Sequence, residues 1–164
     1  MSFHFAIDMP IRGRWENVQL LRTSVESCLN AVFQDVGECR VLATVAGELL
    51  ENAIKYGDRT KQEENYRMRV AGDLNRITVS VSNPVVDNDP GVAEVLKTVE
   101  WIKSFPSAAE AYRARLFEIS QRPRGGAPVS KLGLVRIAYE GGEISASVTH
   151  GILNITVELA IATP

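Results

Sequence analysis

The stretch that decides the fold is GELLENAIKYG, residues 47–57. Its apolar residues follow helical spacing and a glycine closes it, so it predicts the end of an amphipathic helix. Glu48, Asn52 and Lys55 follow one another at steps of four and three residues, which places them on one side of that helix. A solvated face is the ordinary explanation. Asn is a poor choice inside a helix, however, because its amide competes for backbone hydrogen bonds, and this favours a functional explanation.

These three side chains have the chemistry of a magnesium and phosphate site. A carboxylate and an amide oxygen on one helical turn can hold Mg²⁺ through hard oxygen ligands, directly or through a water molecule. A lysine one turn further along can meet a phosphate as a point charge. The sequence therefore makes Glu48, Asn52 and Lys55 candidate site residues.

The composition bounds the class of protein. The chain has 164 residues, 45% of them apolar, and a formal net charge of −2, which fits one globular domain with one core. There is no basic excess to indicate nucleic acid as a partner, and no apolar run approaches the roughly 20 residues of a membrane span. The first residues do not resemble a signal peptide. Cys28 and Cys39 lack metal-ligand spacing, so we expect reduced thiols in a cytoplasmic protein.

Hydrophobic periodicity predicts strands and helices along the whole chain. Strict alternation predicts strands over 2–8, 65–72, 76–82, 143–149 and 152–161. Steps of three and four residues predict helices over 15–36, over 38–56, from about 92, from 107 to about 121, and over about 133–139. Pro10 is expected to end the first strand, and Gly37 to break the first helix.

This order of elements predicts the fold class. Consecutive strands are joined as hairpins, so the sheet should be largely antiparallel, with helices covering one face. We therefore expect an α+β two-layer sandwich formed by a single domain, residues 1–164. The region 83–133, a loop followed by two helices and a glycine- and proline-rich segment, falls between the two halves of the sheet.

ELLENAIKYG closely resembles the N box of the histidine-kinase-like ATPase (GHKL) superfamily, whose nucleotide-binding domain has the Bergerat fold. The family pattern is an acid, three residues, an Asn, then Ala and often Lys-Tyr. The resemblance implies that Glu48 is catalytic and orients or activates the reacting group. It also implies that Asn52 binds Mg²⁺ and that Lys55 contacts a phosphate of ATP.

The C-terminal part, SKLGLVRIAYEGGEISASVTHGILNITVELAI over 130–161, resembles the G2 box and closing hairpin of the same superfamily. A helix that starts through glycine offers free backbone N–H groups to a phosphate. The resemblance therefore adds Lys131, Gly133 and Leu134 to the ATP-binding residues. Leu132 stands where the family has its first glycine.

The middle box departs from the family pattern, which has an Asp after a strand to accept the adenine amino group. Asn83 ends the strand RITVSVS and can accept the same hydrogen bond. The alternative is DNDPGV over 87–92, in which Asp87 would be the acceptor, Gly91 would match the second glycine, and Asp89 would replace the first. We favour Asn83, because Asp87 would require the strand to continue through Pro84. A turn followed by a helix start also explains DNDPG.

The nearest resemblance is to stand-alone serine/threonine kinases of the anti-sigma-factor type, including a branch with a helical lid. It implies an ATP-binding regulator that uses Mg²⁺ and phosphorylates a small antagonist protein in a bacterial partner-switching pathway. The partner would be such an antagonist or a sigma-factor-like regulator. Self-association is common among these relatives, and Trp15 with the N-terminal strand and helix would be a plausible surface for a homodimer, which the sequence does not establish. An autophosphorylating histidine kinase is excluded, because His4 and His150 fall in a strand and a hairpin turn.

A second function class remains open. Leu132, the lost glycine at residue 89 and the helical segment before the G2 box are features of a degenerate member. Such a protein would keep the fold and act as a non-catalytic, protein-binding regulator or scaffold.

Overall fold

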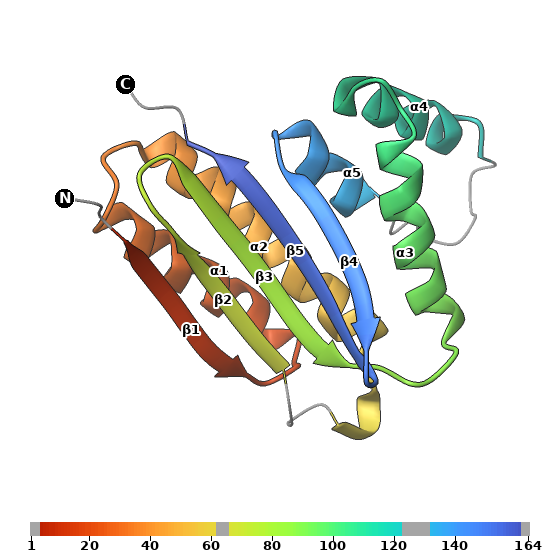
Figure 1. Cartoon of the computed structure of the whole chain (residues 1–164), viewed down its shortest axis with the longest axis horizontal. Helices are drawn as coiled ribbons and strands as arrows, with labels where there is room; N and C mark the ends of the chain where they lie inside the picture. Colours follow the sequence, from red (N-terminus) through yellow and green to blue (C-terminus); the bar gives the residue numbers. More distant parts are fainter. Residues whose placement is uncertain (1–3, 62–65, 123–131, 162–164) are drawn as a thin grey trace.

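The computed structural model contains an antiparallel sheet with helices packed on one face (Figure 1). It describes residues 4–61, 66–122 and 132–161. The described strands follow the spatial order β1-β2-β3-β5-β4. Every neighbouring pair is antiparallel. The predicted α+β two-layer sandwich is confirmed.

The elements follow one another along the chain as the periodicity predicted. The strands are β1 Phe5–Ile11, β2 Tyr66–Gly72, β3 Arg76–Pro84, β4 Glu143–Thr149 and β5 Ile152–Ala160. The helices are α1 Glu16–Asn30, α2 Val36–Tyr56, α3 Pro90–Lys103, α4 Ala108–Ser120 and α5 Leu132–Tyr139, with a 3₁₀ turn at Arg59–Lys61. No helix in the described part of the chain has the length and apolarity needed to cross a membrane.

The core lies between the sheet and α2. Alternate residues of β3 and β5 face the helices and are buried, whereas the residues between them face the open side of the sheet. More than half of α2 is buried against β3 and its neighbours, which makes it the central helix of the helical layer. In Figure 1, α1 and α3 lie on opposite sides of α2.

Two element ends differ from the prediction. β1 continues through Pro10, which pairs with Arg67. The strand lies at the edge of the sheet, where a missing backbone N–H is tolerated. The first helix ends at Asn30 instead of Val36, because Asp35 caps the next helix by accepting a hydrogen bond from the backbone N–H of Glu38 at 3.0 Å.

Gly37 was predicted to break the first helix. It lies instead in the first turn of α2, so that prediction was wrong.

The segment after β3 is a turn followed by a capped helix. The Asp89 carboxylate accepts hydrogen bonds from the N–H groups of Gly91 and Val92, and Pro90 occupies the first turn of α3. α3 then packs beside β4, and α4 lies across the C-terminal end of α3 (Figure 1). Ser107 caps α4, as its spacing to Glu110 predicted.

Candidate functional site

A pocket of about 280 Å³ opens in the helical layer between the start of α1, the second half of α2 and the start of α5. It brings together three residues of the polar stripe, Glu48, Asn52 and Lys55, with Gly133 of the predicted G2 box. The remaining lining residues are Trp15, Glu51, Leu132 and Arg136. The stripe on α2 therefore borders a pocket and is not merely a solvated helix face.

Asn52 is held in place by its helix. Its side chain is buried, and the Nδ2 group donates a hydrogen bond to the backbone carbonyl oxygen of Glu48 at 3.0 Å. This bond uses one of the two N–H groups of the amide and fixes the orientation of the side chain, so that Oδ1 can serve as an acceptor or ligand in the pocket. An amide oxygen fixed in this way is a suitable ligand for a hard cation such as Mg²⁺.

Glu48 lies beside Asn52 in a partly desolvated position. Burial raises the pKa of its carboxyl group, and the nearby negative charge of Glu51 raises that pKa further. The positive charges of Arg136 and Arg22 oppose these two effects. A carboxylate with a raised pKa accepts a proton more readily at neutral pH, which is the property required of a general base.

Gly133 places the start of α5 directly against Glu48. A Cβ atom built on Gly133 would overlap the Oε2 atom of Glu48, so only glycine allows this approach. The structure thus brings the segment around Glu48 and the segment around Gly133, which the sequence analysis assigned to one site, together at the candidate general base.

Two predicted residues of the same segment are placed differently. The side chain of Leu134 is buried in the core and does not line the pocket, so any role would belong to its backbone. Lys131 lies outside the described residues.

Asn83 lies on the core-facing side of β3, beneath the helical layer, and is 1% exposed. Its Nδ2 group donates to the carbonyl oxygen of Pro84 at 3.2 Å, whereas its Oδ1 has no hydrogen-bond partner among the described residues. A buried acceptor without a partner is costly and unusual in a folded protein. It is the kind of atom that would accept a hydrogen bond from an adenine amino group. Asn83 does not, however, line the pocket that holds Glu48 and Asn52.

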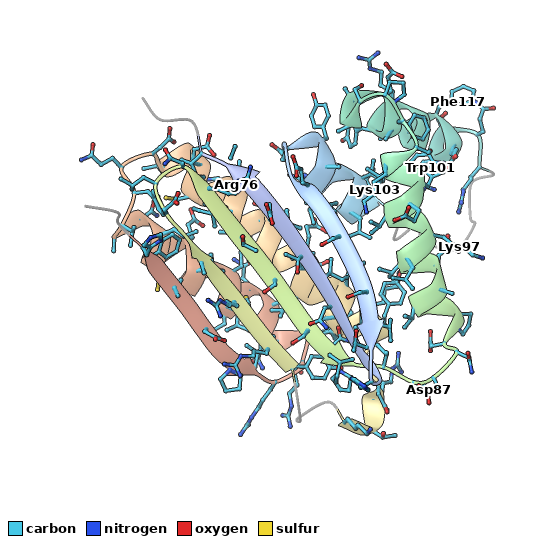
Figure 2. The ribbon with its side chains drawn as sticks, in the orientation of Figure 1. Arg76, Asp87, Lys97, Trp101, Lys103 and Phe117 are labelled. Atoms are coloured by element: carbon cyan, nitrogen blue, oxygen red, sulfur yellow. The ribbon has the colours of Figure 1, made fainter. Side chains whose placement is uncertain are left out.

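The other two residues of the middle region are not brought into the pocket. The sequence analysis disfavoured Asp87 because β3 would have to continue through Pro84. β3 does continue through Pro84, which pairs with β5. The proline is tolerated because the pairing of β3 with β2 ends before it. Asp87 is nevertheless exposed and borders a different pocket of about 620 Å³ at that end of the sheet (Figure 2). Gly91 packs closely against the ring of Tyr56.

Sequence reasoning missed Arg136 and Glu51 as lining residues, and it assigned Trp15 to a surface for self-association instead of this pocket. Arg136 stands three residues after Gly133 on α5, a spacing that puts both on one face of the helix. That signal was present in the sequence. The approach of Trp15 to α2 was not, because it depends on how α1 packs against α2.

The donor set fits ATP with Mg²⁺ in its chemistry. Two oxygen-bearing side chains, Glu48 and Asn52, stand beside Lys55 and Arg136, which supply positive charge for phosphate groups. The unpartnered Oδ1 of Asn83 is an acceptor of the kind that an adenine amino group would require. These two parts are not joined in one pocket, and the pocket around Glu48, at about 280 Å³, lies just below the usual range for ligand sites, roughly 300–1,000 Å³.

The sequence matches no family model. It also matches no curated protein. Among solved structures, the chain is similar to one in the crystal structure of the SiaB-SiaC complex from Pseudomonas aeruginosa, with a TM-score of 0.61 and 19% sequence identity. The alignment covers 96% of this chain and 89% of that chain. At this identity the similarity shows the shared fold alone.

Proposed function

We propose that the chain is an ATP-binding regulator of the histidine-kinase-like ATPase fold that phosphorylates a serine or threonine of a small protein partner. The observation that carries the proposal is the meeting of Glu48, Asn52 and Lys55 with the start of α5 in one pocket. The partner-switching setting is supported by the fold similarity to a chain from a protein–protein complex, SiaB-SiaC.

The proposed roles of Asn52, Lys55 and Arg136 follow from their place in the pocket, and that of Asn83 from its unpartnered Oδ1 beneath the helical layer. Asn52 Oδ1 would hold Mg²⁺, Lys55 and Arg136 would neutralise phosphate charge, and Asn83 Oδ1 would accept the adenine amino group. Bound ATP supplies the terminal phosphoryl group. The acceptor hydroxyl gives its proton to the Glu48 carboxylate while its oxygen bonds to the terminal phosphorus, whose bond to ADP breaks. Glu48 then releases the proton to water.

Thermal unfolding with and without millimolar Mg-ATP tests the nucleotide site. A ligand at about 100 times its dissociation constant stabilises the fold by roughly 2.7 kcal/mol, which is a shift of about 5–10 °C for a domain of this size. The shift should require Mg²⁺ and disappear in Asn52→Ala. The exposed Asn30→Ala, at the end of α1, is the matched control and should shift like the wild type.

Transfer is tested separately by following the label of radioactive ATP into protein or peptide hydroxyls. Glu48→Gln should keep the Mg-ATP shift and lose transfer by about 10²-fold or more, as expected for a general base. Full transfer by Glu48→Gln would contradict its assigned role.

A second candidate function is a regulator that binds a protein partner without catalysis. The separation of Asn83 from the pocket of Glu48 favours it. In that case neither the wild type nor any variant would show a melting-temperature shift with Mg-ATP.

A further inference from the structure

Trp15 contributes little to the local structure around it. It occupies the position before the first turn of α1 and makes no side-chain hydrogen bond to that turn. Ser, Thr, Asp or Asn would cap the helix better at this position. The indole is also 57% exposed, although tryptophan is on average a well-buried residue. Folding alone therefore does not account for a tryptophan here.

The indole nevertheless has a defined place, because Trp15 lines the same pocket as Glu48. Trp15 directly precedes α1. In Figure 1, α1 lies on the side of α2 away from α3. Asn83, the proposed acceptor for the adenine amino group, lies on β3 beneath the helices and next to β5. Asn83 does not line the pocket that Trp15 lines, so the indole is separate from the proposed acceptor for adenine.

A general base has to touch the hydroxyl that it deprotonates, so the acceptor must enter the pocket of Glu48 from outside the protein. The partner therefore passes the exposed rim of this pocket. Tryptophan is the residue most enriched among the anchors of protein–protein interfaces, because it offers a large, rigid apolar surface. Trp15 combines that surface with a place in the same pocket as Glu48, the proposed general base.

We infer that Trp15 anchors the acceptor segment of the partner protein, a stretch of polypeptide that carries the serine or threonine to be phosphorylated. An apolar side chain of this segment packs on the indole while the hydroxyl reaches Glu48. The inference rests on the proposed kinase function and adds to it the surface that selects the substrate. Trp15 makes no bond to the reacting atoms and is a specificity-determining residue.

The test uses an array of serine- and threonine-centred peptides as the acceptor and radioactive Mg-ATP as the donor. Trp15→Ala should raise the KM for the best peptide at least about tenfold, and Trp15→Phe should recover most of the loss because an aromatic surface remains. Leu20→Ala, an equally exposed apolar residue on the same helix, is the matched control and should behave like the wild type. The Mg-ATP shift in melting temperature should be the same in all four proteins.

Each other outcome overturns the inference in a distinct way. Equal peptide labelling by wild type and Trp15→Ala would mean that Trp15 does not contact the acceptor. Loss of the Mg-ATP shift in Trp15→Ala would assign the indole to the nucleotide instead. Conversion of a dimer to a monomer, seen by light scattering with the peptide KM unchanged, would make Trp15 a contact between copies of the chain.

Failure of the proposed function has its own signature. The wild type would then show neither a Mg-ATP shift nor labelling of any peptide, and the inference would fall with it. A wild type with a Mg-ATP shift and no labelling of any peptide would keep the nucleotide site and contradict both phosphoryl transfer and the acceptor site.

Discussion

Gly133 and the Glu48 carboxylate lie so close together that a Cβ atom on residue 133 would overlap the Oε2 atom of Glu48. The two residues are 85 positions apart in the sequence, on different helices. Their contact brings the start of α5 to the candidate base on α2. A Cβ atom on residue 133 would displace only the end of the flexible Glu48 side chain, so the fold could accommodate it. The position of the Glu48 carboxylate in the site, however, depends on glycine at residue 133.

Gly133→Ala should fold and still lose activity. The Glu48 side chain can rotate away from the new methyl group, so we expect the unfolding free energy to change by no more than about 1 kcal/mol. The displaced carboxylate would no longer meet the acceptor, and phosphoryl transfer should fall about tenfold or more. Gly37→Ala is the control, because its Cβ would meet only Asp35 Oδ1, at 3.1 Å on the surface. Wild-type transfer by Gly133→Ala would show that the contact is not needed.

The raised pKa of Glu48 predicts a pH-dependent stability difference. Burial raises the pKa of the folded-state carboxyl above its unfolded value, so the folded state binds more protons between the two pKa values and loses stability as pH rises through them. Glu48→Gln removes this penalty. Its melting temperature should exceed that of the wild type at pH 8, and the difference should disappear below about pH 4, where the unfolded glutamate is also protonated. The exposed Glu140→Gln is the control.

The sequence predicted the fold class because the strands and helices carry strong local signals. β3 and β5 alternate strictly, and Ser107 stands at the right spacing from Glu110 to cap α4. The end of the first strand was predicted wrongly because the effect of its proline depends on the neighbouring strands. Pro10 is tolerated because β1 is an edge strand, which the sequence alone does not reveal.

The candidate site was predictable where its residues lie on one helix. Glu48, Asn52 and Lys55 share a face of α2 by spacing alone. Arg136 shares a helix face with Gly133 by spacing, whereas the position of Trp15 depends on how α1 packs against α2, so periodicity cannot give it. The end of the first helix was missed for a local reason, because the capping side chain of Asp35 outweighed the continuing apolar pattern.

Gly57→Ala should destabilise the fold. Gly57 follows α2 at a φ of −71°, an ordinary value, so its role is close approach. A Cβ there would overlap the Tyr66 hydroxyl and come within 2.6 Å of the Ala53 carbonyl oxygen. We expect a loss of about 1–3 kcal/mol in urea unfolding, as for other overpacked sites. Adding Tyr66→Phe should recover part of this loss, and no recovery would contradict the hydroxyl contact.

Asn83→Leu separates the stability of the fold from its affinity for nucleotide. The substitution removes a buried Oδ1 that has no partner among the described residues, and the Pro84 carbonyl oxygen keeps its hydrogen bond from the backbone N–H of Asp58 at 2.8 Å. Replacing the amide by an apolar group of similar size should therefore raise the unfolding free energy without ligand, by about 1 kcal/mol. The melting-temperature shift with Mg-ATP should shrink in the same variant, because the acceptor for the adenine amino group is lost. A full melting-temperature shift with Mg-ATP in Asn83→Leu would mean that the adenine base is bound elsewhere.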